Sequence, residues 1–295
     1  MDWIEAKQIV SKTKNNQWFG TDYNMNLYRG CHHGCLYCDS RSTCYQIEDF
    51  DRIRGKKEAI EKLKKELSGK RLTGVIGTGA MSDPYNQFEA TEQLTSRALE
   101  IIRDNHFGVA IATKSALVAR DVAVLSEISQ IAPVIVKMTI TTFDETLCRI
   151  IEPNVNPTHK RLEAIKVLSN AGIFTGVLMM PILPFINDTQ ENIINIVNAA
   201  AEMGAKFVYP NFGVTLREGN REYLYQVLNR HDPSLVKKYK ETFGNQYFCE
   251  SPNARQLAAT FNKLVKDYGL YCKMNEITEA YKWKRESHQL SFFDR

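Results

Sequence analysis

The sequence predicts an α/β fold, specifically a partial (β/α)6 barrel with a C-terminal helical extension. Short apolar, β-rich runs alternate with amphipathic helical runs, and this alternation stops after Asn211. Such alternation is typical of a parallel sheet with right-handed crossovers. The six strand–helix units of this chain are too few for a complete eight-fold barrel, so we expect an open one.

Each predicted strand except the last is followed by a predicted helix. The strands are residues 25–29, 75–77, 109–113, 134–141, 174–180 and 207–209. The helices between them are residues 56–67, 92–105, 121–131, 158–171 and 191–203. We therefore expect three parts, which are an N-terminal segment (1–24), the partial barrel (25–211), and the helical extension with its tail (212–295).

Apolar spacing and end signals define the predicted helices. In the first helix, Ile60, Leu63 and Leu67 share one face. Gly172 stands at the C-cap position of the fourth helix, and Gly204 ends the fifth. The run Asp188-Thr189-Gln190-Glu191 before the fifth helix resembles a capping box.

The composition is that of a globular protein outside the membrane. Apolar residues make up 43% of the 295 residues, but no apolar run approaches the length of about 18 that a membrane span needs. The first residues lack a basic segment followed by an apolar stretch, so we expect a cytoplasmic protein. A net charge of +4 permits a nucleic-acid partner without arguing for one.

Three cysteines, Cys31, Cys35 and Cys38, form a C-x3-C-x2-C motif after the first predicted strand. Soft thiolates select zinc, copper(I) or iron–sulfur clusters. Structural zinc takes four protein ligands, and ordinary electron-transfer clusters are closed by a fourth cysteine. Three cysteines therefore favour a [4Fe–4S] cube in which one iron stays open to a substrate or cofactor.

Three alternatives to the open cluster remain from the spacing alone. The motif can form a zinc site that Cys44, His32 or His33 completes. It can also be a chance group of buried thiols, or a redox-active pair. Too few cysteines occur in this chain for a disulfide scaffold.

The predicted fold brings further polar residues to the same place as the cysteines. In parallel α/β folds the chemistry lies at the carboxyl ends of the strands. The cysteine loop, the loop of residues 77–83 and Lys114 each follow a predicted strand end. This convergence supports one functional site at that edge of the sheet.

Several short motifs between residues 28 and 209 carry a family resemblance. They are Arg29-Gly30-Cys31 with Tyr37-Cys38, Ser82-Asp83, Thr113-Lys114, Met138-Thr139-Ile140-Thr141, and Ile151-Glu152-Pro153 followed by Pro157 and Lys160-Arg161-Leu162. With them the chain resembles the radical S-adenosylmethionine (SAM) enzymes. Within that superfamily it is similar to the spore photoproduct lyase-like branch, which is also labelled DNA repair photolyase-like.

The resemblance implies two cofactors and a reaction type. SAM chelates the open iron of a [4Fe–4S] cluster held by the three cysteines. An electron from the reduced cluster then cleaves SAM, and the resulting 5′-deoxyadenosyl radical abstracts hydrogen from a substrate. The electron comes from a reductant such as flavodoxin or ferredoxin.

The resemblance also implies roles for individual side chains. Tyr37 lies against the adenine, and Lys114 pairs with the methionyl carboxylate. Ser82 and Asp83 accept hydrogen bonds from the methionyl ammonium. Thr139 or Thr141 binds the ribose hydroxyls, and Arg161 is a further partner for the carboxylate.

Each of these residues also has a plain structural interpretation. Lys114 can be a solvated lysine at a strand end, and Thr139 and Thr141 can be ordinary strand residues. Asp83 can make a turn with Pro84, and Arg161 can form an ion pair on a helix surface. His32 and His33 are expected to be exposed loop residues. The remaining cysteines, Cys44, Cys148, Cys249 and Cys272, are expected to be core or surface thiols.

The chain departs from spore photoproduct lyase at two positions. In that enzyme a cysteine and a tyrosine return a hydrogen atom to the repaired thymine. The corresponding residues here are Ala80 and Asp39, neither of which carries a transferable hydrogen on a weak bond. We therefore expect radical generation with a different substrate.

The substrate remains open at this stage. A nucleic acid is our first hypothesis. The alternatives are a radical SAM enzyme acting on a peptide, protein or small metabolite, and a non-catalytic iron–sulfur or zinc protein. The C-terminal run Gln289-Leu290-Ser291-Phe292-Phe293 resembles the short peptide that docks bacterial proteins onto the sliding clamp, and two adjacent aromatic rings suit an apolar groove.

Overall fold

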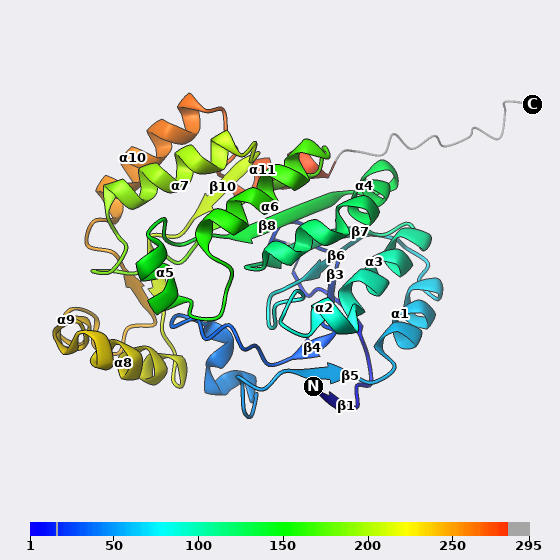
Figure 1. Cartoon of the computed structure of the whole chain (residues 1–295), viewed down its shortest axis with the longest axis horizontal. Coiled ribbons are helices and arrows are strands. Elements are labelled where there is room, and N and C mark those ends of the chain that lie inside the picture. Colours follow the sequence, from blue (N-terminus) through cyan, green and yellow to red (C-terminus); the bar gives the residue numbers. More distant parts are fainter. Residues whose placement is uncertain (16, 283–295) are drawn as a thin grey trace, which may run out of the picture.

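A computed structural model describes residues 1–15 and 17–282, and a mixed sheet forms its centre (Figure 1). Across the sheet the strands run β10 (Phe207–Pro210), β9 (Phe174–Met179), β8 (Val134–Thr139), β7 (Gly108–Thr113), β6 (Val75–Thr78), β3 (Tyr23–Met25) and β2 (Val10–Lys12). Neighbouring strands from β10 to β3 pair in parallel, and β2 pairs antiparallel with β3. The described residues thus form the predicted α/β fold with an open parallel sheet.

Helices between the strands cover one face of the sheet (Figure 1). They are α1 (Ala59–Ser68), α2 (Glu89–Glu92), α3 (Leu94–Asp104), α4 (Val122–Ile131), α6 (Thr158–Asn170) and α7 (Gln190–Glu202), with η3 (Ala116–Asp121) before α4 and α5 (Glu145–Ile151) before α6. Alternate strand residues such as Val109 and Ile111 pack into this helix layer, because successive side chains of a strand point to opposite faces.

A residue of the N-terminal segment and the last described helix pack on the other face of the sheet. Phe19 of the N-terminal region packs with Ile277 and Tyr281 of α11 (Met274–Tyr281) against Ala110 and Ile135 of the sheet. The hydroxyl of Tyr281 donates to the carbonyl of Phe19 at 2.5 Å. Side chains therefore pack on both faces of the sheet, which leaves the carboxyl ends of the strands as the place for a site.

Residues after the last parallel strand form more than the predicted helices. They comprise β11 (Gly213–Thr215), α8 (Asn220–His231), α9 (Pro233–Phe243), β12 (Phe248–Glu250), α10 (Ala254–Asp267) and α11. β11 and β12 make a two-stranded antiparallel sheet. α10 packs on α7, and α8 packs on η1 (Asp39–Arg41), directly after the cysteine loop.

The first predicted strand, residues 25–29, is two strands in different sheets. β3 joins the main sheet, whereas β4 (Tyr28–Arg29) joins a three-stranded sheet with β1 (Asp2–Ile4) and β5 (Arg54–Lys56). The sequence did not predict this break, because the periodicity of a short apolar run does not show which strand it pairs with.

Three predicted helix starts and one strand end are also wrong. Lys56 lies in β5 rather than in the first helix, and Gln93, with φ of 53°, separates α2 from α3. Residues 116–121 form η3, so the next helix starts at Val122. The strand predicted to reach residue 141 ends at Thr139.

The predicted capping box before α7 is replaced by a simpler cap. The side chain of Thr189 accepts from the backbone of Asn192 at 3.2 Å. Asp188 instead accepts from the hydroxyl of Ser251 at 2.5 Å and so joins α7 to the C-terminal extension.

Two further expectations concern the membrane and the tail. Within residues 1–15 and 17–282, no helix has the length and apolar character that crossing a bilayer requires. The clamp-like run from Gln289 to Phe293 lies outside the described residues.

Candidate active site

The cysteine loop begins at the end of β4 and is fixed by backbone bonds at both of its ends. The amide of Cys31 donates to the carbonyl of Phe50 at 2.8 Å, and the amide of Leu36 donates to Ile151 at 3.0 Å. Gly30 has φ of 82°, and a Cβ there would collide with the carbonyl of Arg52. Only glycine fits this turn, because other residues are strained at such angles and have no space.

The three thiols line one cavity at the carboxyl ends of the parallel strands. Cys31 and Cys35 are buried and Cys38 is half-buried. The other lining residues come from the cysteine loop and from the ends of β6, β7 and β8, and they are His33, Ser40, Gly79, Ala80, Met81, Ser82, Asp83, Ala112, Thr113, Lys114 and Thr139. We call this space the cluster cavity.

The electrostatics of the cluster cavity centre on Lys114. Burial raises the pKa of the Cys31, Cys35 and Cys38 thiols, whereas the positive charge of Lys114 opposes that rise at all three. Burial disfavours the charged form of Lys114, but the Cys35 and Cys38 thiols and nearby carboxylates raise its pKa overall. A cation therefore faces the group of thiols, so the interpretation of Lys114 as a solvated lysine is wrong.

Asp83 organises the wall of the cavity. Its carboxylate accepts from the Thr113 hydroxyl at 2.6 Å, from the Lys114 amide at 2.8 Å and from the Tyr85 amide at 2.9 Å. It also lies 3.6 Å from Nδ1 of His33. These bonds tie the loops after β6 and β7 together, so Asp83 makes the predicted turn and still borders the cavity.

Ser82 joins the cavity wall to the cysteine loop. Its hydroxyl donates to the carbonyl of Gly30 at 2.5 Å. The hydroxyl proton is therefore used inside the protein, and the oxygen keeps a lone pair for a donor in the cavity.

Arg161 and Thr141 lie behind the cavity, in a buried network around Glu152. Both Arg161 and Glu152 are fully buried, with 2.8 Å between Nη2 and Oε2, so the predicted helix-surface ion pair is wrong. Nη1 of Arg161 donates to the carbonyl of Thr139 at 2.8 Å, and the Thr141 hydroxyl lies 3.5 Å from Oε1 of Glu152. Of the two threonines, Thr139 lines the cavity.

Tyr37 is part of the same buried network. Its hydroxyl donates to Oε1 of Glu152, and Nζ of Lys114 lies 5.6 Å from the centre of its ring. Burial raises the pKa of the Tyr37 phenol, and the Glu152 carboxylate raises it further. Conversely, Arg161 and Lys114 outweigh burial and hold the pKa of Glu152 below its usual value. Glu152 was not among the predicted site residues, although an acidic residue directly after two isoleucines is a signal in the sequence.

A second space, which we call the outer cavity, opens beside the first. The two share Cys35, Cys38, Ser40, Ala80 and Lys114. The outer cavity is further lined by Tyr37 and Asp39, by Met180 and Pro181 after β9, and by Asn211, Gly213, Val214 and Thr215 of the C-terminal extension. Tyr37 therefore lines the outer cavity and Ser82 the cluster cavity, whereas Lys114 lines both.

Ala80 and Asp39 both border the outer cavity. The Asp39 carboxylate accepts from the Tyr45 hydroxyl at 2.8 Å and lies 3.3 Å from Nε of Arg217. Neither position carries a thiol or phenol.

The two histidines of the loop differ from each other. His33 is buried against Asp83, and burial lowers its pKa, so the expectation that it is an exposed loop residue is wrong. His32 is half-buried, and its Nδ1 atom has no hydrogen-bond partner within the described residues. The remaining cysteines are free thiols as expected, with Cys44 exposed, Cys272 half-buried, and Cys148 and Cys249 buried.

The thiol arrangement suits a cube better than a single ion. Within residues 1–15 and 17–282, no three His, Cys, Asp or Glu side chains are grouped so that they could hold one metal ion. A [4Fe–4S] cube needs no common point, because each cysteine binds a different iron. Three thiols around one cavity, with a lysine cation facing them, fit that group.

Comparison with known proteins agrees with the site. Residues 25–200 match the family model of the radical SAM superfamily. An uncharacterized protein of Mycobacterium tuberculosis is 30% identical over 276 residues, covering 90% of this chain and 80% of the relative. An uncharacterized protein of Methanocaldococcus jannaschii is 32% identical over 189 residues, covering 63% and 69%. The chain therefore belongs to the radical SAM superfamily, and its cofactors are a [4Fe–4S] cluster and SAM.

Solved structures share the fold. Spore photoproduct lyase complexed with a dinucleoside spore photoproduct superposes with a TM-score of 0.65, at 14% identity, covering 90% of this chain and 79% of the other. The radical SAM methyltransferase TsrM of Kitasatospora setae gives 0.56 at 12% identity, covering 82% and 51%. At these identities the likeness concerns the fold alone.

Proposed function

We propose that Cys31, Cys35 and Cys38 hold the [4Fe–4S] cluster and leave one iron open to SAM. The reaction is the reductive cleavage of SAM to a 5′-deoxyadenosyl radical, which abstracts hydrogen from a substrate in the outer cavity. The observation that carries this proposal is the convergence of the three thiols with Lys114 and Ser82 on one cavity at the strand ends.

The neighbouring side chains would bind and orient SAM. When bound, the cluster supplies the electron for the cleavage. Lys114 pairs with the methionyl carboxylate, and the Ser82 oxygen accepts from the ammonium. Tyr37, held by Glu152, offers its ring to the adenine in the outer cavity. Thr139 binds a ribose hydroxyl. Thr141 and Arg161 act indirectly, through their contacts with Glu152.

We further propose a nucleic acid as the substrate class. Thr215 lines the outer cavity and pairs with Phe248 in the β11–β12 ladder. Phe248 and its neighbour Tyr247 are 40% and 51% exposed. Exposed aromatic rings at a cavity rim are suited to stacking on bases, which favours a single-stranded or flipped nucleotide over a small metabolite. A structure with the same fold holds a dinucleoside photoproduct.

The hydrogen-return pathway of spore photoproduct lyase is not part of the proposal. Ala80 and Asp39 border the outer cavity in the places of its donors, and a methyl group and a carboxylate give up no hydrogen atom readily. The substrate radical must therefore be quenched differently. Clamp docking by the run from Gln289 to Phe293 stays a prediction from sequence.

The experiment is anaerobic reconstitution of the protein with iron and sulfide, followed by reduction with dithionite in the presence of SAM. Formation of 5′-deoxyadenosine supports the proposed reaction. A reconstituted cluster that yields none would favour a non-catalytic iron–sulfur protein.

A further inference from the structure

The segment between α5 and α6, residues 152–157, runs beside the cysteine loop, and we call it the connector. Its first residue, Glu152, accepts from the hydroxyl of Tyr37. The next residue, Pro153, faces Gly34, whose φ is 67°, and a Cβ on this glycine would lie 2.9 Å from Cγ of Pro153. Successive residues of the connector therefore contact the loop that carries the cysteines.

Asn154 of the connector binds the cysteine loop through both its side chain and its backbone. Nδ2 of Asn154 donates to the carbonyl of His32 at 2.7 Å, and its backbone amide donates to the carbonyl of His33 at 3.2 Å. Because a carbonyl only accepts, the donor nitrogen of the side chain must be the atom that faces His32. Asn154 thus holds two successive peptide units between Cys31 and Cys35.

One of these peptide units also reaches a predicted cluster ligand. Burial raises the pKa of the Cys31 thiol, and hydrogen bonds from the backbone amides of His33 and Asp83 oppose that rise. The His33 amide and the His32 carbonyl belong to the same planar unit, so a donor that holds the carbonyl also fixes the direction of the amide. Asn154, this peptide and the Cys31 sulfur therefore form a chain of hydrogen bonds, and bonds in such a chain polarise one another.

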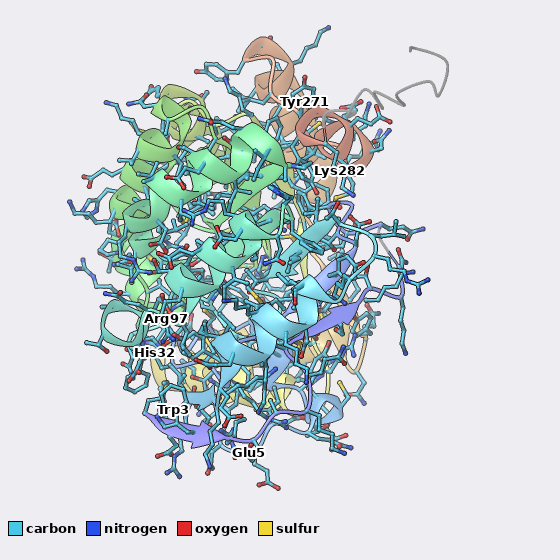
Figure 2. All side chains as sticks on the ribbon, turned by 90° about the vertical axis from the view of Figure 1, so that its right-hand side faces the viewer. Trp3, Glu5, His32, Arg97, Tyr271 and Lys282 are labelled. Carbon is cyan, nitrogen blue, oxygen red and sulfur yellow. The ribbon has the colours of Figure 1, made fainter. Side chains whose placement is uncertain are left out.

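The bond between Asn154 and His32 lies on the solvent side of the cysteine loop. Asn154 is exposed and His32 is half-buried, and Figure 2 shows His32 near the margin of the molecule, between Arg97 and Trp3. Asn154 is not among the described residues that line the cluster cavity or the outer cavity. Any effect of its side chain on the cofactors must therefore pass through the backbone of the loop.

The connector is held in place independently of the cysteine loop. Oδ1 of Asn156 accepts from the amide of Ala116 at 2.7 Å, at the start of η3. Thr158, the first residue of α6, donates through its hydroxyl to the carbonyl of Thr142 at 2.9 Å. Asn154 is therefore presented to the loop from a fixed support, as the positioning of a cofactor ligand requires.

We infer that Asn154 is a positioning residue that raises the reduction potential of the cluster through the peptide between His32 and His33. The inference rests on the proposed function, because Cys31 must be a ligand of the cluster. Hydrogen bonds to the sulfur atoms are among the factors that set the potential of an iron–sulfur cluster. A donor aimed at the Cys31 sulfur stabilises the reduced cluster more than the oxidised one, since reduction adds negative charge.

Loss of the Asn154 side chain would leave the thiols and the cavity walls in place. The His33 amide would then be held less firmly and polarised less strongly, so the reduced cluster would lose stabilisation. The cluster potential would become more negative, whereas the ligand set and the cluster type would stay the same.

The test compares the reconstituted full chain with its variant Asn154→Leu, which nearly keeps the size of the side chain and removes the donor. A redox titration without SAM, followed by electron paramagnetic resonance, gives the midpoint potential, and the spectrum shows whether the cluster type is unchanged. We expect a more negative potential for Asn154→Leu. Asn170→Leu, at the exposed last residue of α6, is the matched control and should titrate like the wild type.

Hydrogen exchange of the cluster-free protein gives a second measurement that needs no cofactor. The amide of Leu36 donates to the carbonyl of Ile151, next to the connector, at 3.0 Å, and it should exchange faster in Asn154→Leu. We expect an increase of roughly three- to tenfold, because a typical hydrogen bond contributes a factor of this order to local stability. Asn170→Leu should exchange like the wild type.

Equal potentials for the wild type and Asn154→Leu would overturn the inference even if Leu36 exchanged faster, since Asn154 would then only stabilise the loop. Unchanged exchange of Leu36 would overturn it as well, because the loop would not depend on Asn154. A wild type that assembles a cluster but forms no 5′-deoxyadenosine would contradict the proposed reaction alone, since the potential is measured without SAM. A wild type that assembles no cluster would overturn both.

Discussion

The carboxylate of Glu152 lies 2.8 Å from the guanidinium of Arg161, and both side chains are fully buried next to the cysteine loop. The same carboxylate accepts from the hydroxyl of Tyr37, which directly precedes Cys38. One buried ion pair therefore fixes the side chain of Tyr37, which borders the outer cavity.

We predict that Glu152→Ala lowers the free energy of unfolding by about 3–5 kcal/mol, because it leaves the buried Arg161 charge without a partner. Urea denaturation of the cluster-free protein measures this change. The control is Glu163→Ala, which removes an exposed pair with Lys160 and should leave the stability unchanged. The double variant Glu152→Leu with Arg161→Met should lose less stability than Glu152→Ala. Equal losses for Glu152→Ala and Glu163→Ala would contradict the role of the ion pair.

Lys114 is predicted to hold the carboxylate of SAM. A charge-assisted hydrogen bond contributes about 1.5–3 kcal/mol, so Lys114→Ala should weaken SAM binding by roughly tenfold or more. Equilibrium binding to the reconstituted protein gives the affinity, and the absorbance spectrum shows whether the cluster is intact. Lys166→Ala, on the exposed side of α6, is the comparison. An unchanged SAM affinity in Lys114→Ala would reject the assignment.

Lys137 predicts a pH dependence of stability that is independent of the cluster. It is buried in β8 with its ammonium 4.5 Å from the ring centre of Phe19, and burial lowers its pKa to about 7. Between that value and the usual pKa near 10.5, the unfolded chain binds more protons than the folded one. The free energy of unfolding should therefore rise with pH across this window, by up to about 1.4 kcal/mol per pH unit.

The comparison for Lys137 is the variant Lys137→Met, measured by urea denaturation of the cluster-free protein at several pH values from 7 to 10. The wild type should gain stability relative to the variant as the pH rises. Lys263→Met, at an exposed position of α10, should follow the wild type. Parallel curves for wild type and Lys137→Met would mean that Lys137 keeps an ordinary pKa in the folded state.

The exposed aromatic pair of the β11–β12 sheet tests the substrate class. If Tyr247 and Phe248 stack on bases, Tyr247→Ala with Phe248→Ala should cost about 1–3 kcal/mol of binding free energy per stacked base. Fluorescence anisotropy with a labelled single-stranded oligonucleotide measures this loss. Tyr268→Ala, which removes an exposed ring at the end of α10, should have no effect. Oligonucleotide binding that is undetectable in the wild type would shift the substrate toward a peptide or metabolite.

The strand–helix alternation was sufficient to predict the parallel sheet and the edge that carries the site. Each long apolar run has a simple period, and the ends of parallel strands must share one edge. The small sheet of β1, β4 and β5 could not be predicted in this way, because its strands are two or three residues long and pair over large sequence separations. No periodic pattern develops over such lengths.

The cysteines and Lys114 could be located from sequence because motif spacing and strand ends both point to them. The orientation of Arg161 could not, since a helix position does not show which side chain is covered by a distant loop. Glu152 comes to Arg161 only through the fold of α5 against α6, and His33 is buried only because Asp83 reaches across from another strand end. Contacts of this kind depend on tertiary packing, which single-sequence patterns do not record.

Assembly of the cluster on three cysteines is the central claim, and cysteine replacement tests it most directly. Cys31→Ala, Cys35→Ala, Cys38→Ala and the control Cys272→Ala would each be reconstituted anaerobically, reduced with dithionite in the presence of SAM, and assayed for cluster absorbance and 5′-deoxyadenosine. The first three should show neither a stable cube nor SAM cleavage, and the control should match the wild type. A Cys38→Ala protein that kept a full cluster and still cleaved SAM would contradict the assignment.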